Sequence, residues 1–471
     1  MSKTKIVCTI GPASWDAATL EQLMLAGMNV CRLNFSHGNQ QEHAELIARI
    51  RAVATKVELP VGILQDLAGP KIRTGVMGAG TVRLAEGDAF TLTSRDVPGD
   101  RHEVGLTFKE LPSMMQAGDT LLLADGLMEL VVEKADRNDI LCRVVTGGDL
   151  GSNKGINLPS RTIAAPALTD KDRSDLDFGI AQNVDYIALS FVRSAADVRA
   201  AKDVIAAAGR KIPVIAKIEK FEALDNIDEI IAEAGGVMVA RGDLGVEIPL
   251  EKVPRAQKMI IARTNEAGKP VITATQMLRS MVDNPRPTRA EVTDVANAIL
   301  DGTDAIMLSE ETTVGHHPVE AVRVMIRIAT ETEAQFDHAA WLARFPDDKK
   351  MSFEAAVAKT AVEMARDIGA AAIITCTKSG STTVKVARYR PQQTLLALTP
   401  DKRTALRMAL VFGAVPVVVP GFVNAEDLES QALKSVTEGG FATPGQAIVI
   451  TAGLPFDVEG TTNLIKISRI P

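Results

Sequence analysis

The sequence has few of the features that mark secreted, membrane-bound or nucleic-acid-binding proteins. Its four cysteines are scattered among 471 residues with no CxxC pair, so we expect reduced thiols, as in the cytosol, at Cys8, Cys31, Cys142 and Cys376. The first residues lack the apolar core of a signal peptide, and no apolar run approaches the roughly 18 residues that a membrane-spanning helix needs. A formal net charge of −7 without a basic block argues against a nucleic-acid-binding surface. We therefore expect a soluble, cytoplasmic protein that binds neither nucleic acid nor membranes.

Strand-like and helix-like segments alternate over most of the chain, whose length suggests about three domains. Three short apolar runs, at residues 5–11, 30–36 and 61–67, are separated by helical patterns. Five more runs follow residue 168, at residues 186–191, 214–219, 237–242, 271–276 and 305–310. Eight parallel strands that alternate with helices are typical of a closed (β/α)₈ TIM barrel, so we expect an α/β fold of this kind.

Two stretches depart from this alternation. Residues 70–167 contain short β-like runs separated by Gly and Asp turns, which predicts a small antiparallel barrel or sandwich inserted as a lid domain. After residue 345 the alternation starts again, with a helix over 402–412 among its elements, and predicts an open α/β sheet. The expected domains are therefore a barrel at 1–69 and 168–345, the β insertion at 70–167, and a C-terminal domain at 346–471.

Charged residues end two neighbouring strand candidates, VIAKIE at residues 214–219 and VMVARGDLGVEIP at residues 237–249. Strand side chains alternate between faces, so Lys217 and Glu219 should point the same way, as should Arg241 and Asp243. A lysine beside two carboxylates is costly unless the group binds something. We predict a divalent cation on Glu219 and Asp243, with an anion that bridges it to Lys217.

Polar side chains also end four other strand candidates, at the edge where the active sites of such barrels lie. They are Arg32, Asn34 and Ser36 on the second strand, Asp66 on the third, Thr273 and Thr275 on the seventh, and Ser309 and Glu311 on the eighth. Any one of them has an ordinary alternative, since Ser, Thr and Asp commonly cap the helix that follows a strand. Six strands with the same pattern favour a functional site instead.

The charges around this edge favour one class of substrate. Arg32, Arg73 and Lys217 are three cations near the predicted metal, which suits a phosphorylated anion. The segment after Gly242 can begin a short helix whose free N–H groups would bind a carboxylate. The residues alone thus predict a small substrate with a phosphate and a carboxylate, and phosphoryl-transfer or enolate chemistry.

Several long motifs make the chain resemble the pyruvate kinase family over its whole length and in the family's order. They are TKIVCTIGP, RLNFSHG, GPKIRTG, KIE, MVARGDLGVEIP, ITATQML and NPRPTRAEVTDVANAILDGTDAIMLS. The resemblance implies Mg²⁺- or Mn²⁺-dependent phosphoryl transfer from phosphoenolpyruvate to ADP, the last step of glycolysis. It also implies a homotetramer and closure of the inserted domain over the site.

The resemblance also assigns roles to the residues already singled out. Lys217 would stabilise charge on the phosphoryl group and the enolate, Arg32 would bind the phosphate, and Glu219 and Asp243 would hold the metal. The backbone of Gly242 and Asp243 would bind the carboxylate. The remaining assignments are Thr275 beside the face where the enolate is protonated, Ser309 and Glu311 in a water relay, and Asn34, Arg73 and Lys154 at the nucleotide.

Two positions depart from the pattern of those relatives that require potassium. Their potassium site matches Asn34, Ser36, Asp66 and the backbone at Leu67, with a glutamate at the position of Lys71 and a threonine at the position of Leu67. An ammonium at Lys71 can supply the charge of the ion, so we predict activity that does not require potassium. The alternative is that Lys71 is a solvated residue at the hinge of the lid. Glu310, where many relatives have a small residue, receives no role.

The C-terminal domain contains a second candidate site, in which Thr377, Lys378, Ser379, Gly380, Ser381 and Thr382 follow a strand and open a helix. Such a turn can be an anion site or a plain connection. In the family the matching loop binds the phosphate of an allosteric effector, with the loop 453–462 nearby. A hexose bisphosphate, a hexose monophosphate, a pentose phosphate and a nucleotide all remain open as effectors.

Two other functions remain to be compared with a phosphotransferase. A metal-dependent aldolase or carboxylyase on a similar barrel would use the same enolate chemistry, but it does not account for the inserted domain, Arg73 or Lys154. A catalytically inactive relative that binds metabolites would not need Lys217 and its neighbours intact.

Overall fold

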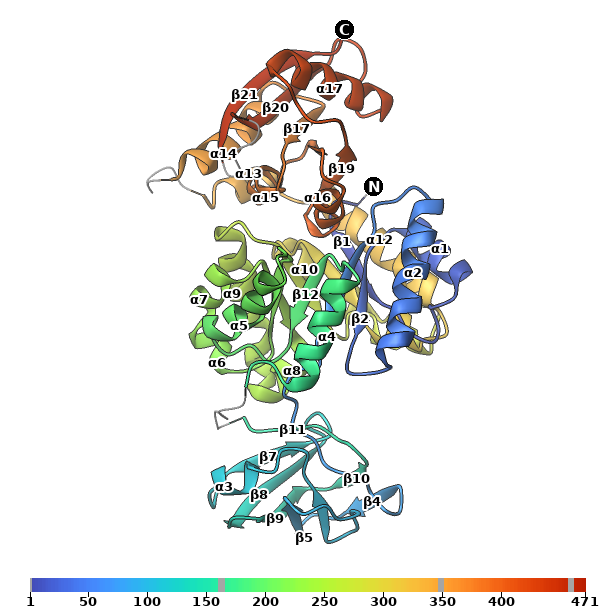
Figure 1. Cartoon of the computed structure of the whole chain (residues 1–471), viewed down its shortest axis with the longest axis vertical. Helices are drawn as coiled ribbons and strands as arrows, with labels where there is room; N and C mark the ends of the chain where they lie inside the picture. The colour runs from blue at the N-terminus through green and yellow to red at the C-terminus, as the bar shows by residue number, and fades with distance from the viewer. Residues whose placement is uncertain (1, 160–165, 346–350, 456–460) are drawn as a thin grey trace.

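The computed structural model describes residues 2–159, 166–345, 351–455 and 461–471. Three bodies are stacked along the long axis of the molecule, with the barrel in the middle (Figure 1). The β insertion lies at one end and the C-terminal α/β domain at the other. Within the described ranges, no helix is both long enough and apolar enough to span a membrane. The four cysteines are buried and free.

The central body is the closed eight-stranded barrel that the sequence predicts, in the order β1-β16-β15-β14-β13-β12-β3-β2 with every pair parallel. Each strand ends one or two residues earlier than expected, because the chain turns toward the next helix where the polar residues begin. The strands are β1 (Lys5–Thr9), β2 (Met28–Asn34), β3 (Gly62–Asp66), β12 (Tyr186–Leu189), β13 (Val214–Ile218), β14 (Gly236–Ala240), β15 (Val271–Ala274) and β16 (Ala305–Leu308).

Helices cover the outside of the barrel and bury their apolar faces against it. Several begin at capping boxes, such as Asn39 with Glu42 and Thr288 with Glu291, which satisfy the free N–H groups of the first turn. The main ones are α1 (Ala17–Ala26), α2 (Gln40–Lys56), α4 (Asp170–Ala181), α5 (Ala195–Ala207), α7 (Ile227–Glu233), α9 (Val253–Glu266), α10 (Arg289–Leu300) and α12 (Pro318–Ala334).

The interior of the barrel is apolar toward one end and polar toward the other. Val7, Val30, Leu64, Ile215 and Met307 belong to one buried cluster inside it. Because side chains alternate along a strand, the residue two positions further along each strand also points inward. Those residues are Thr9, Arg32, Asp66, Lys217 and Ser309. The carboxyl ends of the strands thus form a polar layer above a packed apolar plug.

The inserted region is β-rich, as expected. It forms a six-stranded sheet, β11-β7-β8-β9-β5-β6, and a two-stranded sheet, β10-β4. All pairs are antiparallel except β5 with β6, which is parallel. The elements are β4 (Thr81–Leu84), β5 (Ala89–Thr93), β6 (Glu103–Gly105), α3 (Leu111–Met114), β7 (Thr120–Leu123), β8 (Met128–Ala135), β9 (Asp139–Thr146), β10 (Gly148–Gly151) and β11 (Ile156–Asn157).

The C-terminal domain is an open five-stranded sheet, β19-β18-β17-β20-β21, parallel except for its last strand. Helix α17 (Ala425–Glu438) packs Leu428, Ala432 and Val436 against the sheet. The other elements are α13 (His338–Leu342), α14 (Phe353–Asp367), β17 (Ala372–Cys376), α15 (Ser381–Ala387), β18 (Thr394–Thr399), α16 (Lys402–Arg407), β19 (Ala414–Val418), β20 (Ala447–Gly453) and β21 (Thr462–Arg469).

The C-terminal domain closes the floor of the barrel, opposite the polar layer. We expected one helix over 402–412, but α16 ends at Arg407 and a 3₁₀ turn, η3 (Met408–Leu410), follows it. Ala409 and Leu410 of that turn join the apolar cluster inside the barrel, and the tighter turn places them there. A buried ion pair, Arg390 Nη1 to Asp304 Oδ1 at 2.8 Å, also joins the two bodies.

Candidate active site

Lys217 lies at the centre of the polar layer. Its Nζ atom is 2.9 Å from Glu219 Oε1 and 3.2 Å from Asp66 Oδ1, and it donates to Ser190 Oγ at 2.7 Å. The side chain is only 10% exposed. Burial disfavours its charge, but Asp66 and Glu219 together raise the pKa of Lys217 above its ordinary value. The structure therefore holds a charged ammonium at the mouth of the barrel.

Arg32 enters the same layer from β2. Its Nε donates to Asp66 Oδ2 at 2.6 Å and its Nη1 to Thr9 Oγ1 at 2.8 Å. Burial of Asp66 opposes its ionisation, but Lys217 and Arg32 hold the pKa of the Asp66 carboxyl below its ordinary value. Asp66 thus orients two cations side by side, as a site for a doubly charged anion requires.

Glu219 and Asp243 are the two carboxylates expected to hold a metal. Glu219 is buried, its Oε2 accepts the Phe191 N–H at 2.7 Å, and burial together with the charge of Asp243 raises its pKa. A buried carboxylate whose pKa is raised by a second carboxylate nearby marks a place where a divalent cation relieves repulsion. No group of three or more His, Cys, Asp or Glu side chains suited to a metal occurs in the described parts of the chain. A two-carboxylate site fits Mg²⁺, which keeps waters and substrate oxygens as its other ligands.

Lys71 reaches this carboxylate pair from the start of the inserted region. Its Nζ lies 2.9 Å from Asp243 Oδ1 and 3.4 Å from Asp125 Oδ1, and its side chain is 19% exposed. Burial disfavours the ammonium, but Asp243 above all raises its pKa. Lys71 is therefore not the solvated surface residue of the alternative interpretation. No hydrogen bond or ion pair joins its side chain to Asn34, Ser36 or Asp66 within the described residues.

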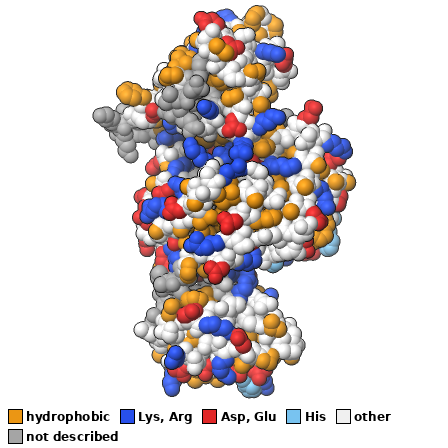
Figure 2. Space-filling model, in the orientation of Figure 1, with side chains coloured by type: hydrophobic (Ala, Val, Ile, Leu, Met, Phe, Trp, Pro, Cys, Tyr) orange, Lys and Arg blue, Asp and Glu red, His pale blue; other side chains and the backbone are white. Residues whose placement is uncertain are grey.

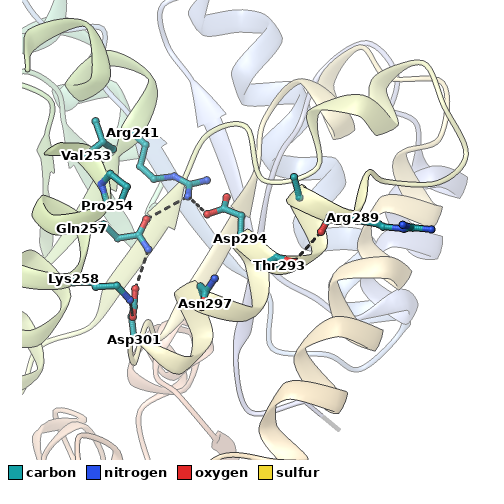
Figure 3. A pocket seen from close by; sticks show the side chains of 11 residues that line it. Arg241, Val253, Pro254, Gln257, Lys258, Arg289, Thr293, Asp294, Asn297 and Asp301 are labelled. Carbon is teal, nitrogen blue, oxygen red and sulfur yellow. Dashed lines mark hydrogen bonds and ion pairs between the residues drawn. The ribbon is translucent and has the colours of Figure 1, made fainter. Parts of the chain in front are cut away.

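Helix α8 (Arg241–Glu247) begins directly after β14, which changes the expected direction of Arg241. We expected Arg241 and Asp243 to share a strand face, and this was wrong because the strand has already become a helix. Arg241 donates to Thr275 O at 2.7 Å and is 2.7 Å from Asp294 Oδ1, and it lies in a pocket between α9 and α10 (Figure 3). Arg241 thereby holds the turn after β15 in place from a position outside the mouth of the barrel.

Thr275 lies just beyond β15 in a strained conformation. Its φ is 73°, a value that β-branched residues rarely adopt. Its Oγ1 accepts the Gly242 N–H at 2.8 Å and donates to Ala274 O at 2.6 Å. The N–H expected to bind a substrate carboxylate is therefore occupied by Thr275. Thr273, which we also placed at the mouth, is buried and bonded to Thr303 Oγ1 at 3.0 Å, because it points to the opposite face of β15.

Ser309 and Glu311 lie together just after β16, where helix α11 (Glu310–Thr313) begins. Glu311 is 1% exposed and accepts two backbone N–H groups, from Leu278 at 3.0 Å and from Ser309 at 2.7 Å. It ties the turn after β15 to the turn after β16. Glu310 is exposed and lies 2.5 Å from Arg279 Nε, in a surface ion pair.

The comparisons with known proteins agree with this geometry. The family model "Pyruvate kinase, barrel domain" matches residues 1–322, and "Pyruvate kinase, alpha/beta domain" matches residues 355–468. The chain belongs to the pyruvate kinase family. Similar relatives are "Pyruvate kinase 2" of Synechocystis, 46% identical over 99% of this chain and 79% of the relative, and "Pyruvate kinase" of Clostridium acetobutylicum, 42% identical over the full length of both. The chain is accordingly a phosphotransferase of this family.

The three residues predicted to contact a nucleotide lie on two different bodies. Asn34, at the end of β2, accepts the Ser36 N–H at 3.1 Å. Arg73 and Lys154 belong to the inserted region, where Arg73 Nη1 donates to Asn153 O at 3.2 Å. The Lys154 side chain is exposed, and its backbone pairs with Thr74. Within the described ranges, no hydrogen bond or ion pair joins Asn34 to either of them.

The C-terminal loop 377–382 adopts the expected connection between β17 and α15. Thr377 Oγ1 accepts the Gly380 N–H at 2.9 Å, and Gly380 has a φ of 88°, which favours glycine. The Oγ1 atoms of Thr382 and Thr462 are 2.8 Å apart, so the end of the loop 453–462 lies beside it. Residues 456–460 of that second loop lie outside the described residues.

Two residues of the site escaped the sequence reasoning. Ser190 accepts from Lys217 and donates to Leu67 O at 2.8 Å, and Phe191, with a φ of 57°, offers its N–H to Glu219. Both lie at the end of the run YIALSF, which we read as a strand throughout. Ser190 is a polar residue at the carboxyl end of a barrel strand, the same signal that identified its neighbours.

Proposed function

We propose that this member of the pyruvate kinase family transfers the phosphoryl group of phosphoenolpyruvate to ADP, giving pyruvate and ATP in the last step of glycolysis. The observation that carries the proposal is the Lys217 ammonium, held between Asp66 and Glu219 beside Arg32. Two fixed cations next to a carboxylate pair suit a substrate that carries a phosphate and develops enolate charge.

Each residue then has a defined task. Arg32 binds the phosphate, and Lys217 stabilises charge on the transferring phosphoryl group and on the enolate oxygen. The backbone of Gly242 and Asp243 binds the carboxylate, which must displace the Gly242 bond to Thr275. Thr275 then lies beside the face of the enolate that takes a proton. Ser309 carries that proton through water, while Glu311 holds Ser309 in place.

Glu219 and Asp243 would hold Mg²⁺ or Mn²⁺. When bound, the ion neutralises charge on the phosphoryl oxygens and orients them. The described chain offers two carboxylates here and leaves the other positions to water and substrate. Asp243 is also the partner of Lys71, so the ammonium and a metal ion compete for one carboxylate oxygen.

The inserted region would act as a lid that brings Arg73 and Lys154 to the nucleotide beside Asn34. We propose the domain division 1–69 with 168–345, 70–167, and 346–471, with a homotetrameric, cytoplasmic enzyme as the assembled form. Closing the lid would exclude water from the phosphoryl group, which protects the transfer from hydrolysis. The separate apolar core of the insertion supports its movement as a unit.

We also propose that potassium is not required. Lys71 brings a fixed positive charge to the carboxylate pair, and the side chain of Leu67 is buried and has no oxygen to offer an ion. The ammonium is bound at Asp243 rather than at Asn34, Ser36 or Asp66. It therefore acts through its positive charge on the carboxylates at the mouth of the barrel and does not occupy the position of a potassium ion.

The test is pyruvate formation from phosphoenolpyruvate and ADP with Mg²⁺, in potassium-free buffer and again with potassium. We expect equal rates within about twofold in the wild type. The double variant Leu67→Thr with Lys71→Glu should lose at least about tenfold of its rate without potassium and recover when potassium is added, because it loses the ammonium and gains a carboxylate that favours a bound cation.

The single variant Lys71→Met is the control, since it removes the charge and adds no ligand, and it should be impaired under both conditions. A wild type that works only with potassium would refute the role of Lys71 but keep the transferase. A folded wild type that is inactive in both buffers, with sugar phosphates present, would favour a catalytically inactive relative.

The loop 377–382 would bind the phosphate of an allosteric effector. Ser381→Glu places a carboxylate in this loop, so we expect it to abolish activation by whichever sugar phosphate or nucleotide activates the wild type at low phosphoenolpyruvate. The rate at saturating substrate should not change, because the loop is remote from Lys217. Equal activation of the variant and the wild type would contradict the assignment.

A further inference from the structure

A basic cavity lies between the floor of the barrel and the C-terminal domain, away from the candidate active site and from the loop 377–382. It has a volume of about 160 Å³. Five cationic side chains from three segments line it, namely Arg51 of α2, Arg210 and Lys211 before β13, and Arg403 and Arg407 of α16. Figure 2 shows Lys and Arg side chains gathered where these two bodies meet.

The carboxylates of the cavity do not balance these charges. Asp185 is the one carboxylate that lines it, and it already binds Arg51 Nη2 at 2.7 Å and the Ile63 N–H at 2.7 Å. Within the described residues, the other four cations form no ion pair with it, and Arg407 contributes only a longer-range charge interaction. Among the described residues, the side chains of Lys211 and Arg403 have no hydrogen bond or ion pair at all.

Arg407, one of the two partly buried cations among the four, also lacks a full set of partners. Arg407 donates through Nη2 to Lys211 O, and its Nε is buried with no acceptor in the described structure. A buried guanidinium N–H without an acceptor costs free energy. Tyr186 OH donates to the backbone carbonyl of Arg407, so the main chain that carries this arginine is anchored to the barrel. An anion would complete its hydrogen bonds.

We propose that this cavity binds the phosphate group of a small phosphorylated metabolite, or free phosphate, and thereby joins α16 to the barrel floor. Guanidinium groups match phosphate oxygens in pairs, and the volume accommodates a phosphate with a few attached atoms but not a whole nucleotide. The site differs from the loop 377–382, which contacts α16 elsewhere, where Thr404 Oγ1 donates to Lys378 O at 2.8 Å.

The experiment is calorimetric titration of the full-length chain, in buffer free of phosphate and sulfate, with orthophosphate and separately with glycerol 3-phosphate. The test variant is Lys211→Ala with Arg403→Ala, which removes two side chains that have no partner in the described structure and so should not disturb folding. The matched control is Lys134→Ala with Arg137→Ala, an equal loss of charge on exposed positions of the insertion. The variant Ser381→Glu distinguishes binding in the cavity from binding at the loop 377–382.

We expect the test variant to lose one binding site, or to bind at that site at least about tenfold more weakly, which is about 1.4 kcal/mol. The control and Ser381→Glu should retain that site. Glycerol 3-phosphate that binds as tightly as orthophosphate identifies a phosphate ester as the ligand, and binding of orthophosphate alone identifies the free anion. Equal affinities and site numbers in the test variant and the control would overturn the proposal, as would an equal loss in both.

Discussion

Replacing Lys217 with methionine is expected to lower kcat/KM by about 10³-fold, or about 4 kcal/mol of transition-state stabilisation. The ammonium of Lys217 contacts both Asp66 and Glu219, and those two carboxylates hold it at the mouth of the barrel. Methionine has a similar length and packs into the same space, but it cannot stabilise charge on a phosphoryl group or an enolate. The measurement is steady-state pyruvate formation at several concentrations of phosphoenolpyruvate.

The same substitution should also weaken folding, because Glu219 would remain buried without its cation. Two observations separate loss of fold from loss of chemistry. Circular dichroism should show a folded variant, and Mn²⁺ should still bind, since Glu219 and Asp243 are unchanged. Lys217→Arg keeps the charge but not the geometry, and it should stay impaired. A folded Lys217→Met variant with activity within about tenfold of wild type would remove Lys217 from the mechanism.

Much of this architecture could be predicted from the sequence. Short apolar runs at regular spacing define the eight barrel strands, and the alternation of side chains along them places Arg32, Asp66 and Lys217 in one layer. That layer is polar because the apolar plug below it already fills the barrel. Local pattern was sufficient here because the same signal is repeated on strand after strand.

The rest of the structure could not be predicted in this way, because it depends on contacts that a local sequence pattern does not contain. The sequence does not reveal where a strand turns into a helix, and for that reason Arg241 was assigned to the wrong face and Ser190 was overlooked. The pairing of Lys71 with Asp243 joins the inserted region to the barrel across 172 positions of sequence. The basic cavity likewise forms only when three distant segments meet.

Replacing Asp243 with asparagine is expected to weaken Mn²⁺ binding by at least about tenfold and to lower kcat/KM by about 10²-fold or more. In the part of the chain that the structure describes, no group of three or more such side chains could hold a metal, so the loss of the Asp243 charge leaves Glu219 as the remaining proposed ligand. The Asp243 side chain is 27% exposed, so asparagine fits without burying an unpaired group. Mn²⁺ affinity is measured by electron paramagnetic resonance, which does not depend on turnover.

Asp125→Asn is the matched control for this variant, because Asp125 is the other carboxylate beside Lys71, at 3.4 Å. Its side chain is 77% exposed and has no proposed contact with the metal. Both variants remove one negative charge from the surroundings of Lys71, but only Asp243→Asn removes a proposed metal ligand. We expect Asp125→Asn to keep its Mn²⁺ affinity and activity within about twofold of wild type. Equal Mn²⁺ affinity in the two variants would show that Asp243 serves only to hold Lys71, and the metal would then have to be sought at Glu219 with substrate oxygens alone.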